Sequence, residues 1–484
     1  MHKQGAHNNK AGKPVHDSRE VSSADAPIFF AITGYQSDGH EHAQAALQAG
    51  ATAIVAEHEI PGIPTALLTI VENSRIALAH AAADYFENPG ADLAITGVTG
   101  TNGKTTTIYL LDAIARAAGE VSGLIGTVET RFGECVHSSK TTTPDALALQ
   151  ELLATMRDAG VESVAMEVSS HAIDLHRVEA LPFAVVAFTN LSQDHLDYHK
   201  TMEEYRAVKE GLFTDYEAKS RVINIDDKVG AELAARLEED GYEITTVGIE
   251  SANEPLITAR DCRVTAQGTD FTLRTPDGAL PVSLPLMGDY NLSNALVAAA
   301  CSWCRGISPE AIAKGLSQAP QVPGRLERVN CGQPFAVLVD YAHTPDALRT
   351  ALAALRPFCA GRLITVFGCG GDRDPKKRPL MAQAAGEGSD LVVATSDNPR
   401  SEDPDSILRQ VVSGLKAGAT PFEVIRDRRS AIEWALSQAQ DGDCVLIAGK
   451  GHEDYQLFAD RTIHFDDREV ARDILAAQGY EARC

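Results

Sequence analysis

The spacing of apolar positions changes repeatedly along this chain, and each change marks the border of an expected strand or helix. In residues 1–90, short apolar runs alternate with alanine-rich stretches, which predicts a small α/β domain. Its strands are expected at residues 28–32, 53–56 and 66–70. The sequence Asn88-Pro89-Gly90 is a natural boundary after it, because these residues favour turns.

Residues 91–320 repeat this alternation on a larger scale, so we expect a central domain whose mostly parallel sheet is covered by helices on both faces. Buried strands are predicted at 162–168 and 183–190, and both end in polar residues. Residues 257–286 have a strand-like pattern, and a helix is expected over 291–306.

Residues 321–484 again alternate strands and helices, and each strand leads into a polar or glycine-rich loop. The strands are expected at 336–340, 363–367, 391–395 and 444–448. This order predicts a doubly wound, Rossmann-like α/β domain, in which ligands bind at the carboxyl ends of the strands. The expected fold is therefore a three-domain α/β protein.

Composition narrows the classes of partner. Asp and Glu number 67 against 43 Lys and Arg, so the 484-residue chain has a formal net charge of −24. This charge argues against nucleic acid or an anionic membrane as the main partner. The chain has no run of ~18 apolar residues and no apolar leader, and its nine cysteines are scattered. We expect a soluble, cytoplasmic, monomeric protein that does not insert into membranes.

The sequence with the most specific chemical meaning lies early in the central domain. An apolar run is followed by Gly100-Thr101-Asn102-Gly103-Lys104-Thr105 and then by a helical pattern. In such a strand–loop–helix unit, backbone N–H groups surround a polyphosphate, and the helix N-terminus adds positive charge. Lys104 would reach the outer phosphates, and the Thr105 hydroxyl would bind magnesium. A chance Gly-Lys-Thr turn is the alternative.

Polar clusters follow four of the expected strands, at 167–171, 190–199, 340–346 and 368–374. Carboxylate and imidazole groups at strand ends near a phosphate loop favour ligands for a hard cation that bridges ATP phosphates. Any single histidine there could equally be a hydrogen-bonded loop residue. Taken together, the four clusters favour a site.

With the phosphate loop, these clusters resemble the Mur ligase family of ATP-dependent amide ligases. The resemblance extends from about Asp17 to Gln456. It rests on Asp17-Ser18-Arg19, Gly34-Tyr35-Gln36-Ser37-Asp38-Gly39-His40, Gly100-Thr101-Asn102-Gly103-Lys104-Thr105, Thr142-Thr143-Pro144, Met166-Glu167-Val168-Ser169-Ser170-His171, Pro323-Gly324-Arg325-Leu326-Glu327, Asp397-Asn398-Pro399-Arg400 and Gly449-Lys450-Gly451-His452-Glu453.

The resemblance implies an activity. The chain is similar to the family's members that add meso-2,6-diaminopimelate to UDP-N-acetylmuramoyl-L-alanyl-D-glutamate in cytoplasmic peptidoglycan precursor synthesis. ATP would convert the substrate carboxylate to an acyl phosphate, and the amino group would then attack it. Catalysis would consist largely of positioning and of charge neutralisation by Mg²⁺ and Lys104. The expected partners are ATP, the UDP-sugar dipeptide and diaminopimelate.

The resemblance also implies which residues bind ATP and metal. The ATP positions are Gly100, Thr101, Asn102, Gly103, Lys104, Thr105, Thr106, Asn294, Arg325 and Asp340. The catalytic positions are Lys104, Glu167, His195 and Lys209. Mg²⁺ is expected on Thr105, Glu167, His195 and Lys209.

Lys209 shares one helical face with Met202, Tyr205 and Leu212. On this pattern alone, a lysine that extends to water is the simpler interpretation. The family places a carbamylated lysine at the matching position, formed with CO₂, and its anionic oxygen helps to hold magnesium. The resemblance therefore implies that Lys209 is N6-carboxylysine.

The other two substrates also have matching positions. Those for the UDP-sugar are Ser18, Tyr35, Thr142, Thr143, Ser169 and Arg177. Those for diaminopimelate are Arg373, Asp397, Asn398, Pro399, Arg400, Gly449 and Glu453. Arg400 suits bidentate carboxylate binding, and the family's lysine-adding members lack this arginine. His16, Tyr35 and Leu175 depart from the family's usual pattern.

Other ligases of the family are the nearest alternatives: the lysine-adding form, the D-alanyl-D-alanine-adding enzyme and folylpolyglutamate synthetase. Arg400 and Asp17-Ser18-Arg19 argue against them. A phosphate-loop GTPase or mechanical ATPase predicts an Asn-Lys-x-Asp sequence or a Walker-B partner, and we find neither. A non-catalytic sugar-nucleotide binder would not explain Lys104, Glu167 and Lys209 together.

Overall fold

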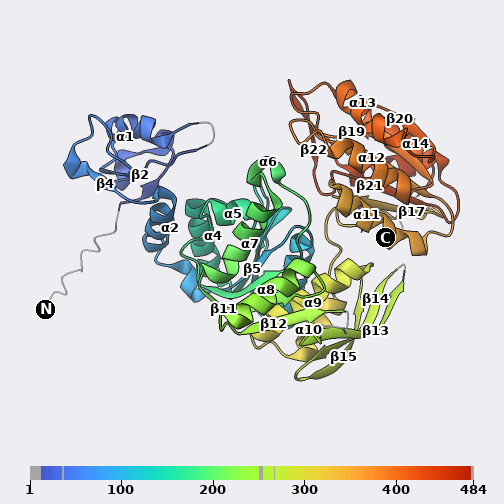
Figure 1. The fold of residues 1–484 in the computed structure, drawn as a ribbon, viewed down its shortest axis with the longest axis horizontal. Helices are drawn as coiled ribbons and strands as arrows, with labels where there is room; N and C mark the ends of the chain where they lie inside the picture. Colours follow the sequence, from blue (N-terminus) through green and yellow to red (C-terminus); the bar gives the residue numbers. More distant parts are fainter. Residues whose placement is uncertain (1–11, 35–36, 250–253, 266, 481–484) are drawn as a thin grey trace.

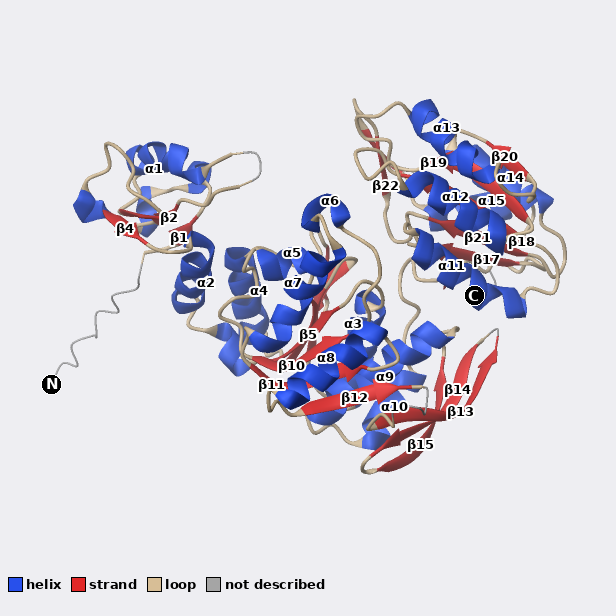
Figure 2. Cartoon of the chain, in the orientation of Figure 1, coloured by secondary structure: helices blue, strands red, loops and turns tan. Residues whose placement is uncertain are grey.

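The computed structural model describes residues 12–34, 37–249, 254–265 and 267–480, which form three α/β domains in chain order (Figure 1). Each domain has its own sheet with helices packed on it (Figure 2). The expected three-domain α/β fold is confirmed, whereas its boundaries at 90/91 and 320/321 stay predictions. None of the described helices is long and apolar enough to cross a membrane.

The first domain has a parallel sheet in the order β1-β2-β3-β4. Its elements are β1 (Pro14–Val15), β2 (Ile28–Phe30), α1 (Ala43–Ala49), β3 (Ala53–Ala56), β4 (Leu68–Ile70) and α2 (Ser74–Tyr85). α2 begins where the Asn73 side chain accepts the backbone N–H groups of Arg75 and Ile76. α1 ends at Gly50, whose φ of 113° favours glycine.

The central sheet has eleven strands in the order β15-β14-β13-β12-β11-β10-β5-β9-β6-β7-β8. Its strands are β5 (Ala94–Thr99), β6 (Ser122–Ile125), β7 (Glu129–Phe132), β8 (Cys135–Ser138), β9 (Ser163–Glu167), β10 (Phe183–Phe188), β11 (Ala218–Asn224), β12 (Ile244–Gly248), β13 (Ile257–Thr265), β14 (Gly268–Thr275) and β15 (Gly278–Leu284). Its helices are α3 (Lys104–Ala117), α4 (Ala146–Asp158), α5 (Ser170–Asp174), α6 (Leu196–His199), α7 (Met202–Thr214), α8 (Lys228–Glu239), α9 (Asp289–Cys304) and α10 (Pro309–Ser317).

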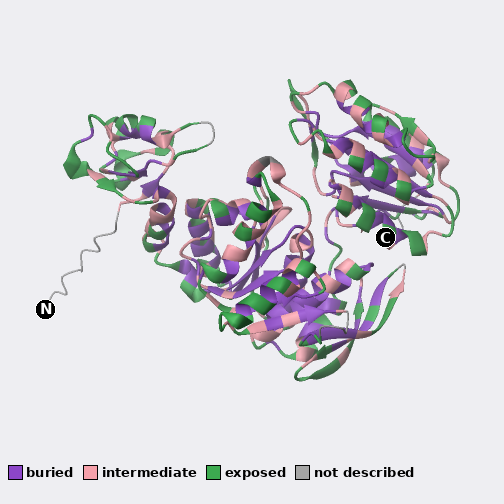
Figure 3. Ribbon diagram, viewed as in Figure 1, coloured by how far each residue is buried: buried purple, intermediate pink, exposed green. Residues whose placement is uncertain are grey.

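The strands from β13 to β6 are parallel, and antiparallel strands extend the sheet at both edges. β5 is buried on both faces: Val98 packs in the core cluster that contains residues of α3, α9 and α10, and Ile95 in the cluster that contains residues of α4, α7 and α8. Figure 3 shows this burial as continuous purple along the central strands. A strand covered on both faces explains why residues 93–99, before the phosphate loop, contain no charged side chain.

The third domain has a sheet in the order β16-β17-β21-β18-β19-β20, in which only β16 is antiparallel to its neighbour. Its strands are β16 (Glu327–Arg328), β17 (Ala336–Asp340), β18 (Leu363–Cys369), β19 (Leu391–Ser396), β20 (Phe422–Val424) and β21 (Cys444–Ala448), with a separate hairpin of β22 (Tyr455–Leu457) and β23 (Thr462–His464). Its helices are α11 (Pro345–Leu355), α12 (Lys377–Gly388), α13 (Pro404–Leu415), α14 (Arg428–Gln438) and α15 (Asp467–Ala477). The loops after β18, β19 and β21 therefore lie at one edge of this sheet.

Candidate active site

The phosphate loop between β5 and α3 has a backbone that glycine adopts most easily. φ is 145° at Gly100 and 89° at Gly103. A Cβ at Gly100 would lie 1.9 Å from Thr189 Oγ1, and a Cβ at Gly103 would lie 2.2 Å from Asn294 Oδ1. The two glycines thus let the loop pack closely against the end of β10 and against α9, which brings the expected ATP residue Asn294 to the loop.

Lys104, the first residue of α3, folds back over this loop. Its Nζ donates hydrogen bonds of 2.8 Å to the carbonyl oxygens of Gly100 and Thr101. Burial lowers the pKa of Lys104, although the Glu167 carboxylate opposes that shift. An ammonium held at a helix N-terminus is placed to neutralise a bound phosphate.

Glu167, the last residue of β9, connects α3 to the turn between β6 and β7. Its Oε1 accepts hydrogen bonds from Thr105 Oγ1 at 2.9 Å and from the Thr127 backbone N–H at 2.8 Å, and its Oε2 accepts one from Thr127 Oγ1 at 3.0 Å. A hydroxyl beside a carboxylate fits Mg²⁺, which takes oxygen ligands and usually binds one or two carboxylates together with substrate phosphates. Among the described residues, no group of three His, Cys, Asp or Glu side chains could hold a metal. Substrate phosphates are expected to supply further oxygen ligands.

Four of the expected UDP-sugar positions surround Glu167. Hydrogen bonds join Thr127 to Thr142, Thr143 to the Glu167 carbonyl and to the Ser169 backbone N–H, and Arg177 to the Thr143 carbonyl. This chain of contacts begins at Thr105, so the structure brings part of the expected sugar site next to the phosphate loop.

The other positions on the sugar side do not join this cluster. Ser18 lies in the first domain, at the start of a short 3-10 helix. Tyr35 lies outside the described residues. Of the two remaining departures, Leu175 directly follows α5, and His16 is partly buried near β1.

Lys209 on α7 does not extend to water, so the simpler interpretation of the apolar stripe is wrong. The residue is 1% exposed, and its Nζ donates a 2.8 Å hydrogen bond to the Gly100 carbonyl and lies 4.8 Å from the centre of the Tyr205 ring. Burial, reinforced by the positive charge of Lys104, places the pKa of Lys209 well below its ordinary value. A larger neutral fraction follows, and the neutral amine is the form that reacts with CO₂.

His195 directly precedes α6 and lies near Tyr205. The two ring centres are 6.1 Å apart, and His171 lies 5.1 Å from His195. Burial lowers the pKa of His195 to about 4, although Asp194 opposes the shift. The imidazole is therefore neutral at pH 7, as a metal ligand must be. Lys209 and His195 both lie beside Tyr205, whereas Thr105 and Glu167 contact each other directly.

Arg325, in the third domain, contacts the end of the phosphate loop. Its guanidinium donates a 3.1 Å hydrogen bond to Thr105 Oγ1 and lies 4.7 Å from the centre of the Tyr341 ring. Asp340, at the end of β17, accepts the backbone N–H groups of Leu326 and Ala342. Burial raises the pKa of Asp340, although Arg325 opposes that shift. The expected ATP positions of the two domains thus converge.

The expected diaminopimelate residues lie on the loops after β18, β19 and β21. Asn398 Nδ2 donates a 2.8 Å hydrogen bond to Glu453 Oε2. Gly449 has a φ of 117°, and a Cβ there would lie 2.8 Å from Asp397 Oδ2. Burial would raise the pKa of Asp397, but positive neighbours, with Lys450 first among them, bring it below its ordinary value. This carboxylate is therefore an anion at neutral pH.

Arg400 lies on the loop after β19 and Arg373 on the loop after β18, at the same end of the sheet as Asp397 and Glu453. Arg400 has a φ of 53°, and its guanidinium donates a 2.8 Å hydrogen bond to the Gly371 carbonyl, next to Pro399. Arg373 is exposed and donates to the Asp372 carbonyl. A non-glycine residue in the left-handed region stores strain that is typical of ligand-binding sites.

Several residues that shape the site had no assigned role from the sequence. The Asn190 side chain accepts the Asn102 backbone N–H and donates to the Asn102 carbonyl, so it fixes the phosphate loop. Tyr205 contacts Thr101 Oγ1 through its hydroxyl. Asn190 stood in a predicted polar cluster and Tyr205 on the Lys209 stripe, which were the available signals. No sequence pattern pointed to Thr127.

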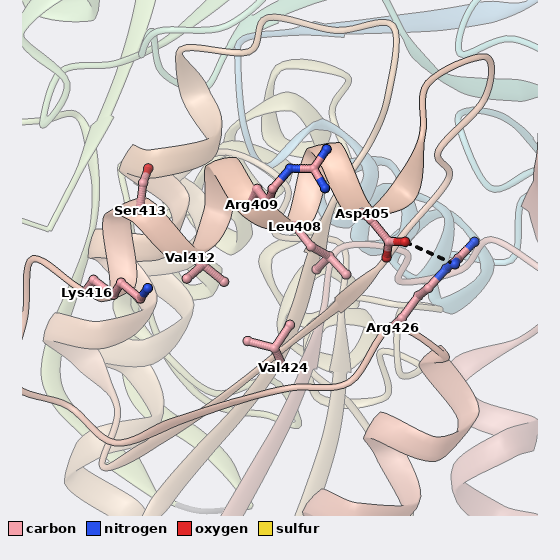
Figure 4. Close-up of a pocket in the computed structure, with 8 residues that line it drawn as sticks. All are labelled: Asp405, Leu408, Arg409, Val412, Ser413, Lys416, Val424 and Arg426. Carbon is pink, nitrogen blue, oxygen red and sulfur yellow. Dashed lines mark hydrogen bonds and ion pairs between the residues drawn. The ribbon is translucent and has the colours of Figure 1, made fainter.

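A surface hollow between α13 and β20 is not part of this site (Figure 4). Its floor is Leu408, Val412 and Val424, and an exposed ion pair of 3.2 Å joins Arg426 to Asp405 at its rim. None of the expected site residues lines it.

Comparisons with known proteins find matches in all three domains. Three family models match: the Mur ligase family catalytic domain at residues 15–86, the Mur ligase middle domain at 98–302, and the Mur ligase glutamate ligase domain at 324–451.

Two curated relatives have the name UDP-N-acetylmuramoyl-L-alanyl-D-glutamate–2,6-diaminopimelate ligase. The one from Geobacillus kaustophilus is 45% identical over 96% of this chain and 94% of its own length, and the one from Gloeobacter violaceus is 45% identical over 95% and 93%. A solved structure with the same ligase name is 34% identical with a TM-score of 0.70, covering 96% of this chain and 95% of that one. A MurF ligase from Thermotoga maritima in complex with ADP shares the fold at 18% identity, with a TM-score of 0.65 over 98% of this chain and 99% of its own.

Proposed function

This chain belongs to the Mur ligase family, and on that premise we propose that it is the ATP-dependent, ADP-forming ligase that adds meso-2,6-diaminopimelate to UDP-N-acetylmuramoyl-L-alanyl-D-glutamate. The observation that carries the proposal is the contact of Thr105 with Glu167, which joins the phosphate loop to the expected sugar residues. The chain is also 45% identical to a relative that is named as the diaminopimelate ligase. The substrates are small molecules of the cytoplasm, and the product is a peptidoglycan precursor.

The reaction must activate a carboxylate before an amine can displace an oxygen from it. The γ-phosphoryl group of ATP passes to that carboxylate, giving ADP and an acyl phosphate; the amine then attacks the carbonyl carbon, and phosphate leaves. Lys104 and the loop N–H groups hold the phosphates, and Arg325 closes on them from the third domain. Thr105 and Glu167 would hold Mg²⁺, which neutralises phosphate charge. Binding both substrates next to one loop supplies much of the rate by orientation.

We propose that Lys209 is carbamylated and that its carbamate oxygen and His195 complete the ligand set of a metal. The neutral amine attacks CO₂, a C–N bond forms, and one proton leaves to solvent. We expect ¹³C NMR of the protein under ¹³CO₂ to show a carbamate carbon at pH 7.5 that weakens as the pH falls, because protonation of the amine removes the reactive form. Lys209→Gln should lack the signal, and exposed Lys219→Met should keep it. A signal unchanged in Lys209→Gln would contradict the assignment.

Arg400 is proposed to bind the carboxylate that distinguishes diaminopimelate from lysine. Because a hydrogen-bonded charge pair contributes about 1.5–3 kcal/mol, Arg400→Ala should raise KM for diaminopimelate by about 10- to 100-fold. KM for ATP should change by less than about twofold, since Arg400 lies outside the phosphate loop. Exposed Arg409→Ala on α13 is the matched control. An equal rise in KM for all substrates would contradict a specific contact between Arg400 and diaminopimelate.

The decisive experiment measures ADP release by the purified protein with ATP, Mg²⁺ and UDP-N-acetylmuramoyl-L-alanyl-D-glutamate, with meso-diaminopimelate or L-lysine added in parallel. Release that depends on diaminopimelate supports the proposal. Release with lysine alone would keep the ligase but overturn the assignment of Arg400, and release with neither would overturn the proposed function.

A further inference from the structure

Lys450 is a buried cation that none of the steps above uses. It follows Gly449 after β21, and its side chain is 0% exposed. Its Nζ donates hydrogen bonds of 2.9 Å to Glu453 Oε2 and 3.3 Å to Asn398 Oδ1, and it lies 5.3 Å from the centre of the Tyr455 ring. Burying an ammonium costs free energy unless such partners replace its water.

The Lys450 ammonium determines how the Asn398 amide is oriented. An ammonium can only donate, so the end of the amide that faces it must be the oxygen, which also accepts the Leu457 backbone N–H at 2.9 Å. The amide nitrogen is thereby directed to Glu453 Oε2, at 2.8 Å. Both bonds to the carboxylate end on Oε2, and within the described part of the chain no hydrogen bond ends on Glu453 Oε1. One carboxylate oxygen is therefore left for a ligand.

The charges around Glu453 depend on the same lysine. Burial raises the pKa of Glu453; Lys450 opposes this shift, and Asp397 adds to it. Other charged or titratable groups packed here are Tyr341 after β17, Arg400 after β19, Tyr455 on β22, and Arg428 of α14, which is paired with Asp467 of α15. Without Lys450, two carboxylates would lie near each other at the strand ends with less compensating charge.

We infer that Lys450 is a positioning residue for the amino-acid substrate: it fixes the Asn398 amide and holds Glu453 as an anion whose free oxygen binds an ammonium group of diaminopimelate. The inference rests on the proposed function, because it takes the loops after β19 and β21 as the amino-acid site. It adds a residue that contacts no substrate but sets the charge and the direction of two that do.

The test is the pH dependence of KM for diaminopimelate. In the wild type, KM should change by less than twofold between pH 6.5 and 8.5. In Lys450→Met, KM should rise at least tenfold at pH 6.5 and fall again by at least fivefold towards pH 8.5, because the higher pH restores the Glu453 anion. KM for ATP should stay within twofold. Exposed Lys416→Met in the same domain is the control and should match the wild type. A rise in KM for diaminopimelate that does not depend on pH, or an equal rise in KM for all substrates, would overturn the inference.

A double-mutant cycle keeps the inference testable if Lys450→Met does not fold. Glu453→Gln/Lys450→Met contains no unpaired buried charge at this pair, and it is compared with Glu453→Gln alone. The Leu457 backbone N–H still holds the Asn398 oxygen in both variants, so adding Lys450→Met should change KM by less than threefold if Lys450 acts through the charge of Glu453. A tenfold or larger further rise would overturn the inference. Failure of the proposed function is a separate outcome, because the wild type would then release no ADP with diaminopimelate.

Discussion

Lys104→Met is expected to lower kcat by about 100- to 1000-fold, the usual cost of removing one preorganised group that stabilises transition-state charge. Met keeps the length of the side chain but removes its charge and all three donors. The Gly100 and Thr101 carbonyls, each 2.8 Å from Nζ, would lose those bonds, and the transferring phosphoryl group would lose the ammonium proposed to neutralise it. Steady-state ADP release at saturating substrates measures the effect.

The matched control is Lys219→Met, because Lys219 is exposed on β11. It should keep wild-type kcat. KM for the UDP-sugar should stay within about threefold in Lys104→Met, since the Thr142, Thr143 and Arg177 contacts do not involve the lysine. A Lys104→Met enzyme with kcat reduced by less than tenfold would show that the helix N-terminus and bound cation suffice for phosphoryl transfer.

The parts of the fold that are buried on a regular pattern could be predicted from the sequence. The strands expected at 53–56, 336–340 and 444–448 match β3, β17 and β21 residue for residue. β7 and β8 were not predicted. All four residues of β8 (Cys135–Ser138) are exposed, so that strand has no apolar face to produce a period of two.

In the candidate site, too, some residues could be predicted from the sequence and others could not. Glycine spacing before Lys104 has a local physical cause, so it could be interpreted directly. The burial of Lys209 could not, because the stripe on α7 is the same whether its lysine faces water or the phosphate loop. The contacts of Glu167 with Thr127 and of Lys450 with Asn398 join strand ends and loops that are 40 and 52 positions apart in the sequence. The directions of these side chains follow only from the assembled sheets.

Arg428→Met is expected to destabilise the third domain by about 3–5 kcal/mol, because it leaves an uncompensated charge inside the protein. The Arg428 and Asp467 side chains are both 0% exposed, and two hydrogen bonds of 2.7 Å join them. Arg428 also donates to the Ala448 carbonyl at the end of β21 at 3.0 Å. Because a three-domain protein need not unfold in one step, the measurement is hydrogen exchange of the β21 amides in the full chain, which should become faster.

Arg429, the next residue, is a control that separates the effect of a buried charge from that of an exposed one. Arg429 also forms an ion pair, with Asp473 at 3.7 Å, but its side chain is 51% exposed and that of Asp473 is 66% exposed. Exposed pairs contribute about 0–1 kcal/mol, so Arg429→Met should leave β21 exchange nearly unchanged. Arg428→Met/Asp467→Leu should exchange more slowly than Arg428→Met alone, since removing both charges ends the desolvation cost of the unpaired carboxylate. If the two single variants behaved alike, the Arg428–Asp467 pair would not stabilise the edge of the sheet that carries Asp397 and Glu453.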